Sequence, residues 1–128
     1  MVTETLARCL ESGDFAPLIG AYAPGALFDA HVPGWRFQLE GPEAIIEQLG
    51  GWWPGPGRLA VWEVTTSEDG FVVQFERWWR ESDDVNCRQL HRLRLEAGQV
   101  VEHVVYCAGK WGPELRAEMA TASPLVRP

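Results

Sequence analysis

The sequence has 128 residues, a formal net charge of −7 and 46% hydrophobic residues. This length and composition are typical of one globular domain, and they exclude a disordered chain. The acidic excess argues against a nucleic-acid partner or an anionic membrane surface, because both are bound by clustered Lys and Arg. The composition is unusual in having seven tryptophans but only two tyrosines.

The first ten residues include Glu4 and Arg8 and no long apolar run, so we expect neither a secretory signal nor a membrane span. The cysteines, Cys9, Cys87 and Cys107, are odd in number and widely spaced, which argues against a disulfide framework. We therefore expect a reducing, cytoplasmic setting. Cys87 and Cys107 fall in strand-like segments, where the simplest interpretation is that they are small buried hydrophobic residues.

The first half of the chain predicts short helices with two strands between them. Apolar residues recur at helical spacing, Gly13 is a typical helix stop, and Pro42 is suited to a first helical position. The predicted helices cover residues 2–12, 15–22 and 42–49, and the predicted strands cover 26–32 and 35–40.

The second half predicts strands separated by turn signals such as Asp69-Gly70 and Ala97-Gly98. The predicted strands cover 58–67, 70–80, 86–96 and 99–108, followed by a short helix over 113–119 and a tail over 121–128. Helices followed by hairpin-linked strands indicate an α+β domain over residues 1–120, with helices on one face of an antiparallel sheet.

The turns also predict which residues are neighbours, because opposite residues in an antiparallel pair share a face. We take Asp69-Gly70 and Ala97-Gly98 as two-residue turns and residues 81–85 as a five-residue loop. The resulting opposite pairs are Trp62 with Arg77, Phe75 with His91, and Gln89 with Tyr106.

The predicted buried face therefore carries the polar residues Arg77, Gln89, His91 and Tyr106 among apolar ones. Unpaired burial would cost roughly 1–3 kcal/mol for each polar group, so they must pair with one another or line a cavity. Trp62 lies across from Arg77 in this register, where a cation–π contact is expected.

The same arithmetic makes the last strand apolar on both sides. It places Val101, His103, Val105 and Cys107 on the outer face. Because an antiparallel sheet in a monomer usually has one wet face, we expect a homodimer through the sheet face.

This order of elements resembles the nuclear transport factor 2-like superfamily, which includes polyketide-cyclase-like and ketosteroid-isomerase-like members. The matching segments are Ala21-Tyr22-Ala23-Pro24, residues 27–34 (LFDAHVPG), residues 41–45 (GPEAI) and residues 98–103 (GQVVEH). The resemblance implies a cone-shaped α+β fold with three N-terminal helices on a curved, mostly antiparallel sheet. It also implies a deep pocket between helices and sheet, and commonly a dimer through the sheet. The superfamily includes isomerases, dehydratases, cyclases and non-catalytic domains, so the fold does not select one activity.

Asp29 and His31 project to one side of the first predicted strand. In the fold that the resemblance implies, this strand lies near the pocket, and an acid–imidazole pair can act as a general base. The alternative interpretation is a solvated edge strand.

His91 and Arg77 are candidates on the predicted buried face. His91 is either a pocket acid or base, or a structural histidine bonded to a neighbour such as Tyr106. Arg77 either orients a carboxylate or oxyanion, with help from Tyr106, or forms a structural ion pair with Glu102 or Asp29.

The tryptophans and the remaining polar residues suggest a binding site. Trp35 and Trp52 lie in loops or at element ends, where they can clamp a flat apolar ligand, although tryptophans also fill cores. The predicted ligand-binding residues are Trp35, Trp52, Trp62, Gln89 and Tyr106. The histidine spacing shows no metal-binding pattern, and we expect neither a metal nor another cofactor.

These features favour a pocket protein for a small apolar or enolisable molecule. The leading hypothesis is a cofactor-independent isomerase, cyclase or dehydratase that uses general acid–base catalysis on an apolar ring substrate, with catalytic candidates Asp29, His31, Arg77 and His91. The alternative is a non-catalytic ligand-binding or dimerisation module of the same fold.

Overall fold

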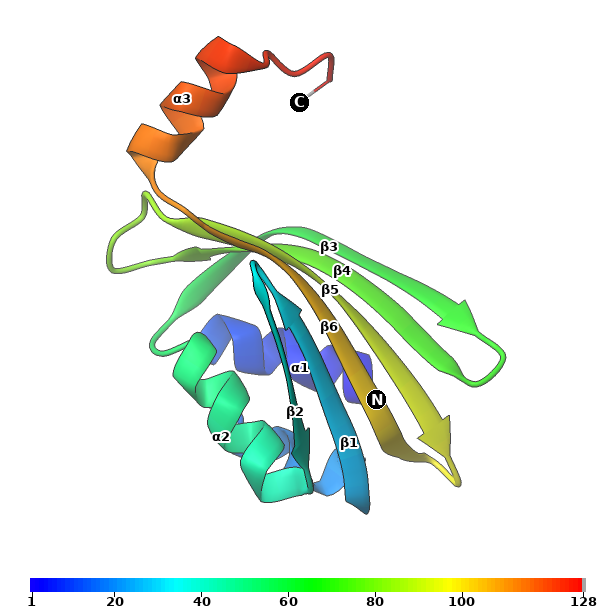
Figure 1. The fold of residues 1–128 in the computed structure, drawn as a ribbon. Helices are drawn as coiled ribbons and strands as arrows, with labels where there is room; N and C mark the ends of the chain where they lie inside the picture. Colours follow the sequence, from blue (N-terminus) through cyan, green and yellow to red (C-terminus); the bar gives the residue numbers. More distant parts are fainter. Residues whose placement is uncertain (128) are drawn as a thin grey trace.

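A curved six-stranded sheet with helices against one face forms the computed structural model, which describes residues 1–127 (Figure 1). The helical elements are α1 (Val2–Ser12), the 3₁₀ helix η1 (Ala16–Ala21), α2 (Pro42–Trp52) and α3 (Pro113–Ala122). The strands are β1 (Tyr22–Val32), β2 (Trp35–Glu40), β3 (Gly57–Ser67), β4 (Gly70–Trp79), β5 (Asn86–Glu96) and β6 (Gln99–Trp111). The α+β prediction is confirmed.

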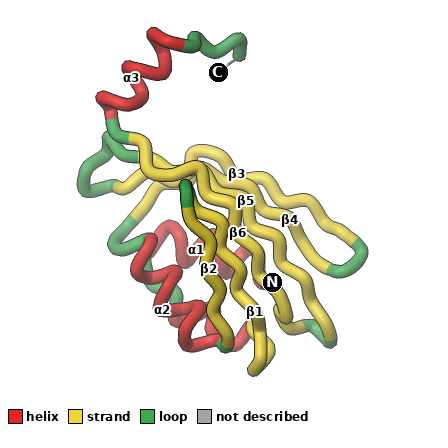
Figure 2. The backbone as a smooth tube through the Cα atoms, viewed as in Figure 1, coloured by secondary structure: helices red, strands yellow, loops and turns green. Residues whose placement is uncertain are grey.

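The strand order is β2-β1-β6-β5-β4-β3, and β1 pairs parallel with β6 while the other pairs are antiparallel. Helices α1 and α2 lie against one face, which we call the inner face (Figure 2). Helix α3 leaves the end of β6 on the opposite side, toward the outer face (Figure 1).

Apolar spacing and helix-ending residues account for the helices on the inner face. In α1, Leu6, Cys9 and Leu10 are buried, and the helix ends at Gly13, which has φ 82° and whose N–H donates to the Cys9 carbonyl. A Cβ at Gly13 would collide with the Gly55 backbone, so this close approach also requires glycine. The predicted second helix is shorter than expected, because the chain already becomes extended at Tyr22.

Two predicted registers are wrong by two residues. The first turn consists of Glu68 and Asp69, so Trp62 pairs with Phe75 and not with Arg77. Likewise, Phe75 pairs with Gln89 and not with His91. Because side chains alternate with a period of two, an even slip changes the partners but keeps each residue on its predicted face.

The third register is wrong by one residue, which inverts the prediction for β6. A β-bulge leaves Val101 unpaired between the Leu95–Val100 and Arg94–Glu102 pairs. Beyond the bulge, Gln89 pairs with Cys107 and not with Tyr106. As a result, His103 is fully buried, whereas Tyr106 is 53% exposed.

This inversion corrects two predictions about β6. Val105 and Cys107 face inward together with His103, not outward as predicted, and Tyr106 faces outward. The predicted dimer therefore loses the outward His103, Val105 and Cys107 that suggested it. Val104 and Tyr106 take their places on the outer face.

Candidate functional site

A chain of hydrogen bonds between buried side chains crosses the inner face; we call it the histidine chain. The Tyr22 hydroxyl lies 2.8 Å from His103 Nδ1, and His103 Nε2 lies 2.7 Å from His91 Nδ1. His91 Nε2 lies 2.7 Å from Gln89 Oε1. Residues from β1, β5 and β6 thus meet in one network, which explains how the core accommodates two histidines.

The direction of these hydrogen bonds follows from the charge state of the histidines. Burial lowers the pKa of His91 to about 3 and that of His103 well below its ordinary value, so both rings are neutral at pH 7. The Gln89 carbonyl oxygen accepts from His91 Nε2, which leaves His91 Nδ1 to accept from His103. The Tyr22 hydroxyl, whose pKa is raised by burial, keeps its proton and donates a hydrogen bond to His103 Nδ1.

Cys107 lies at the end of this chain. Its sulfur is 3.6 Å from the sulfur of Cys87, accepts the Gly109 N–H at 3.3 Å, and is hydrogen-bonded by the Gln89 side chain. The hydrogen bond with Cys87, together with those from Gln89 and Gly109, lowers the pKa of Cys107 to about 6. For the same reason, the pKa of Cys87 is raised, first by its hydrogen bond with Cys107 and then by burial.

A second β-bulge gives Cys107 its backbone donor. Between the Cys87–Lys110 and Gln89–Cys107 pairs, Arg88 on β5 faces two residues of β6, Ala108 and Gly109. Gly109 has φ 95°, a value that favours glycine. Such bulges re-aim groups locally, and here the Gly109 N–H is directed at the Cys107 sulfur.

These sulfurs border a pocket of about 360 Å³ between α2, β2 and the ends of β1, β4, β5 and β6; we call it the tryptophan pocket. Its lining residues are Val32, Phe37, Gly51, Trp52, Trp53, Trp79, Cys87, Gln89, Cys107 and Lys110. The Lys110 ammonium lies 4.6 Å from the Trp79 ring centroid, a cation–π distance. The pocket thus combines aromatic walls with one polar edge of Gln89, Cys107 and Lys110.

Arg77 lies behind the wall of this pocket and is fully buried. Its Nε donates to the Leu10 carbonyl at 2.8 Å and its Nη2 to the Gly55 carbonyl at 2.6 Å. Burial lowers its pKa to about 10, so the guanidinium remains charged at pH 7. It joins the last turn of α1 to the loop before β3, the region where a helix favours a cation.

The aromatic partners of Arg77 differ from the predicted one. The guanidinium carbon lies 5.3 Å from the Trp53 ring centroid and 5.1 Å from that of Trp79, and not over Trp62. The predicted ion-pair partners are also engaged elsewhere, since Asp29 pairs with Arg36 and Glu102 with Arg92. The two-residue register difference is the reason that Trp62 is too far along the strand.

Asp29, His31 and Tyr106 gather with Arg36 on the outer face, and we call this group the outer cluster. Arg36 on β2 donates two hydrogen bonds to Asp29, at 3.0 and 2.8 Å, and the hydrogen bond from Arg36 lowers the pKa of Asp29. His31 Nε2 lies 3.3 Å from Asp29, and its ring stacks on Tyr106 with centroids 4.6 Å apart. None of these residues lines the tryptophan pocket.

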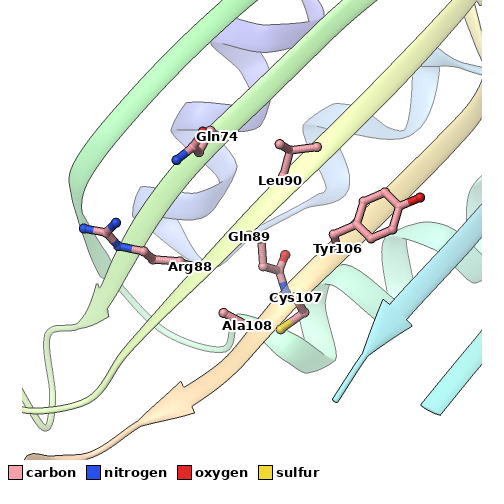
Figure 3. A pocket seen from close by; sticks show the side chains of 7 residues that line it. All are labelled: Gln74, Arg88, Gln89, Leu90, Tyr106, Cys107 and Ala108. Atoms are coloured by element: carbon pink, nitrogen blue, oxygen red, sulfur yellow. The ribbon is translucent and has the colours of Figure 1, made fainter. Parts of the chain in front are cut away.

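A shallow hollow of about 380 Å³ borders Tyr106 on the sheet (Figure 3). Its lining residues are Gln74, Arg88, Gln89, Leu90, Tyr106, Cys107 and Ala108, from β4, β5 and β6. Figure 3 shows Gln74, Leu90 and Tyr106 side by side across these strands.

The structure therefore divides the predicted site residues into separate groups. Trp52 and Gln89 line the tryptophan pocket, and His91 reaches it through Gln89. Trp62 packs beside Phe75 on the inner face, and Trp35 is 71% exposed at the start of β2.

Sequence reasoning missed three polar residues that matter in this region, namely His103, Cys107 and Lys110. The first two were assigned to the wrong face, and Lys110 was placed beyond the end of the last strand. Gly109 was an available signal for the second bulge, which turns Lys110 inward opposite Cys87, whereas the bulge at Val101 that turned His103 and Cys107 inward carries no such signal. Within residues 1–127, no three His, Cys, Asp or Glu side chains gather in a way that would hold a metal ion.

Comparison with known families identifies the class of protein. The family model of the SnoaL-like domain matches residues 2–103, so the chain belongs to the SnoaL-like family. The resemblance to the nuclear transport factor 2-like superfamily is thereby confirmed. No curated protein matches the sequence significantly.

Solved structures share this fold at low sequence identity. An NTF2-like protein of unknown function from Mesorhizobium loti is 20% identical with a TM-score of 0.65, covering 84% of this chain and 91% of its own. An NTF2-like protein from Anabaena variabilis is 12% identical with a TM-score of 0.67, covering 84% of each chain. A putative SnoaL-like polyketide cyclase from Shewanella putrefaciens is 14% identical with a TM-score of 0.63, covering 95% of this chain and 84% of its own.

The described helices are also informative about membranes. Among residues 1–127, no helix combines the length and the apolar character that crossing a bilayer requires.

Proposed function

We propose that this protein binds a small, largely apolar molecule with a carbonyl or enol oxygen in the tryptophan pocket and moves a proton on it. The reaction class is that of a cofactor-independent isomerase, cyclase or dehydratase. The observation that carries the proposal is one polar edge, formed by Gln89, Cys107 and Lys110, on a pocket whose other walls are mainly aromatic rings.

The aromatic walls suit a flat ring. Trp52 contacts Phe28 and Phe37 with ring centroids 5.8 and 6.0 Å apart, while Trp53 stacks on Trp79 at 5.2 Å. Mutual packing holds these rings in place, so a ligand meets a preformed apolar surface. The indole N–H groups of Trp53 and Trp79 are buried and have no partner within residues 1–127, so these two rings offer a ligand apolar surface and not a hydrogen bond.

The polar edge supplies the groups for proton transfer. Cys107, with a pKa of about 6, is a thiolate at pH 7 and is the proposed base for a carbon beside a carbonyl. The Lys110 ammonium is the proposed partner of the developing oxyanion. Gln89 holds the base in place, and His91 in turn holds Gln89, so His91 is a positioning residue.

Binding is tested by tryptophan fluorescence with a panel of cyclic ketones and polyketide-like compounds. Trp52→Ala is expected to weaken binding about tenfold, since an aromatic contact contributes about 1.4 kcal/mol. Trp35→Ala is the matched control, because this exposed tryptophan does not line the pocket, and its affinity should equal that of wild type. If none of the panel binds, or if both variants weaken binding equally, the pocket assignment is wrong.

Proton transfer is tested by deuterium exchange at the carbon beside the ketone, followed by NMR in deuterated buffer. Cys107→Ala should abolish catalysed exchange, whereas Cys9→Ala, which changes a buried thiol of α1, should retain it. His91→Ala should move the pH profile of exchange to higher pH, because Gln89 loses its anchor. Binding without exchange in wild type would favour the non-catalytic ligand-binding alternative.

The proposal includes a homodimer through the outer face and a reducing, cytoplasmic setting. On the outer face, Leu90 pairs with Tyr106 and Arg92 with Val104, so apolar side chains alternate with charge. Sedimentation at micromolar concentration should give twice the chain mass of 14.3 kDa. A monomer would contradict the dimer without affecting the pocket assignment.

A further inference from the structure

We propose that Cys107 and Cys87 form a redox-active pair: a small hydroperoxide oxidises Cys107 in the tryptophan pocket, and Cys87 then closes a disulfide with it. This inference goes beyond the proposed function and does not depend on it, because the oxidation needs no carbonyl ligand.

The geometry brings both sulfurs to the same place. Cys87 on β5 and Cys107 on β6 line the tryptophan pocket, with their sulfurs 3.6 Å apart. A disulfide requires about 2 Å between the sulfurs, so a small local movement closes the gap. The bulge at Ala108–Gly109 interrupts the ladder between these two residues, and this is where the strands can adjust.

The surroundings give the two thiols different roles. Cys107 accepts hydrogen bonds from Cys87, Gln89 and the Gly109 N–H, which favour its thiolate, the nucleophilic form. Cys107 is also half-buried, whereas Cys87 is 3% exposed and keeps its proton. The more accessible thiolate is therefore the attacking group, and the protonated neighbour is the resolving group.

The chemistry balances with the peroxide as oxidant. The Cys107 thiolate attacks one peroxide oxygen, the O–O bond breaks, and the departing oxygen takes a proton to leave as water or an alcohol. The sulfur is now a sulfenic acid. The Cys87 sulfur, after losing its proton, attacks it; the S–O bond breaks, the S–S bond forms, and the hydroxide leaves as water. In sum, two thiols and one hydroperoxide give one disulfide, one alcohol or water, and one further water.

Lys110 completes the site for this reaction. It is the cationic residue among those lining the pocket, and Cys87 and Cys107 are the other titratable residues there. An ammonium group at this edge can protonate the departing oxygen. It also favours the thiolate of a neighbouring cysteine, and it acts in this direction on Cys87 when that residue loses its proton.

The test is peptide mass spectrometry of the full chain, first reduced and then treated with stoichiometric hydrogen peroxide at pH 7. Wild type should give a Cys87–Cys107 linked peptide that dithiothreitol reverses. Cys87→Ser should instead accumulate a sulfenic acid at Cys107 that dimedone labels, and Cys107→Ser should show neither product. Cys9→Ser is the matched control and should still form the linked peptide, because Cys9 does not line the pocket.

A second measurement on wild type avoids dependence on variants. The rate of Cys107 alkylation by iodoacetamide should rise with a midpoint near pH 6. A midpoint in the ordinary thiol range of about 8.5 would overturn the assigned thiolate. Failure of the peroxide to link Cys87 to Cys107, with oxidation going only to sulfinic acid or to Cys9, would overturn the proposal. Ketone binding would be untouched by that result, so failure of the disulfide leaves the binding proposal standing. The alkylation midpoint bears on both proposals, because each assigns a thiolate to Cys107.

Discussion

The same residue types have opposite surroundings on the two faces of the sheet. On the inner face, His91 and His103 are fully buried and neutral, and their partners are a phenol, an amide and each other. On the outer face, His31 is partly exposed, lies beside the Asp29 carboxylate and stacks on Tyr106. The arginines differ in the same way, since Arg77 is held by carbonyls and indole rings, whereas Arg36 pairs with a carboxylate.

This difference shows that burial, and not residue type, decides how much a polar side chain contributes to the free energy of unfolding. When a buried polar group that has hydrogen-bond partners is lost, those partners are left unpaired away from water, which lowers the free energy of unfolding. The charges of an exposed ion pair are solvated by water when the pair is broken, so the pair contributes little to the free energy of unfolding. The following predictions test this contrast, beginning with the largest effect.

Arg77→Ala should lower the free energy of unfolding by about 3–5 kcal/mol, because it opens a cavity beside Trp53 and Trp79 and leaves the buried Leu10 carbonyl and the part-buried Gly55 carbonyl without their donor. Arg36→Ala on the outer face should lower it far less, because this side chain is 58% exposed and its ion pair is open to solvent. Urea unfolding followed by circular dichroism measures both. Equal losses at the two positions would refute the contrast between the faces.

His103→Leu should lower the free energy of unfolding by about 2–3 kcal/mol, since Tyr22 and His91 both lose a hydrogen-bond partner. Adding Tyr22→Phe should recover part of the loss by removing one stranded hydroxyl, a result that chemical denaturation of the double variant detects. His31→Leu is the outer-face comparison and should change stability by about 1 kcal/mol or less. If the losses of unfolding free energy from His103→Leu and Tyr22→Phe simply add in the double variant, Tyr22 and His103 are not energetically coupled.

Stability should fall as the pH drops below about 6.5, the ordinary pKa of histidine. The folded-state pKa values of His91 and His103 are lowered, to about 3 for His91, so in this window the unfolded chain binds more protons than the folded one. Each histidine then contributes a slope of up to about 1.4 kcal/mol per pH unit. Thermal unfolding between pH 4.5 and 6.5 measures the slope.

Two comparisons separate the histidine contribution from other groups. His103→Leu should show a clearly shallower slope between pH 4.5 and 6.5 than wild type. Asp29, whose pKa is lowered, changes the stability only at lower pH. Its carboxylate stabilises the fold at and above the ordinary aspartate pKa of about 4, and this contribution is lost as the pH falls below that value. The pKa of Cys107 is also lowered, to about 6, so above that pH the folded chain binds fewer protons than the unfolded one and the stability rises with pH. A pH-independent stability from 4.5 to 6.5 would mean that the buried histidines are not neutral.

Asp29→Ala should also have a small effect, about 1 kcal/mol or less, because the Asp29 side chain, itself 13% exposed, pairs with an Arg36 side chain that is 58% exposed. The loss should shrink further in 1 M salt, which screens exposed pairs, and denaturation at two salt concentrations checks this. A loss as large as that of His103→Leu would indicate that Arg36 is also buried in the folded protein, as a dimer through this face would require.

The outcomes of the register predictions have a simple geometric explanation. The hairpins at Glu68–Asp69 and between β4 and β5 slipped by two residues, so Arg77, Gln89 and His91 are on the inner face as predicted. The bulge at Val101 shifted β6 by one residue, which exchanged His103 for Tyr106. A bulge adds one residue without a turn signal of its own, and pattern reasoning therefore missed it.

The sequence by itself determined the fold class, the order of most elements and the polar residues that the inner face must accommodate. Local information suffices for these features, because hydrophobic spacing, prolines and glycines act within a few residues. Only the tertiary structure decided that His91 bonds His103, that Cys107 lies beside Cys87, and that Trp53 and Trp79 enclose Arg77. Those contacts depend on strand register and on loops that meet across the sheet, and one bulge is enough to change them.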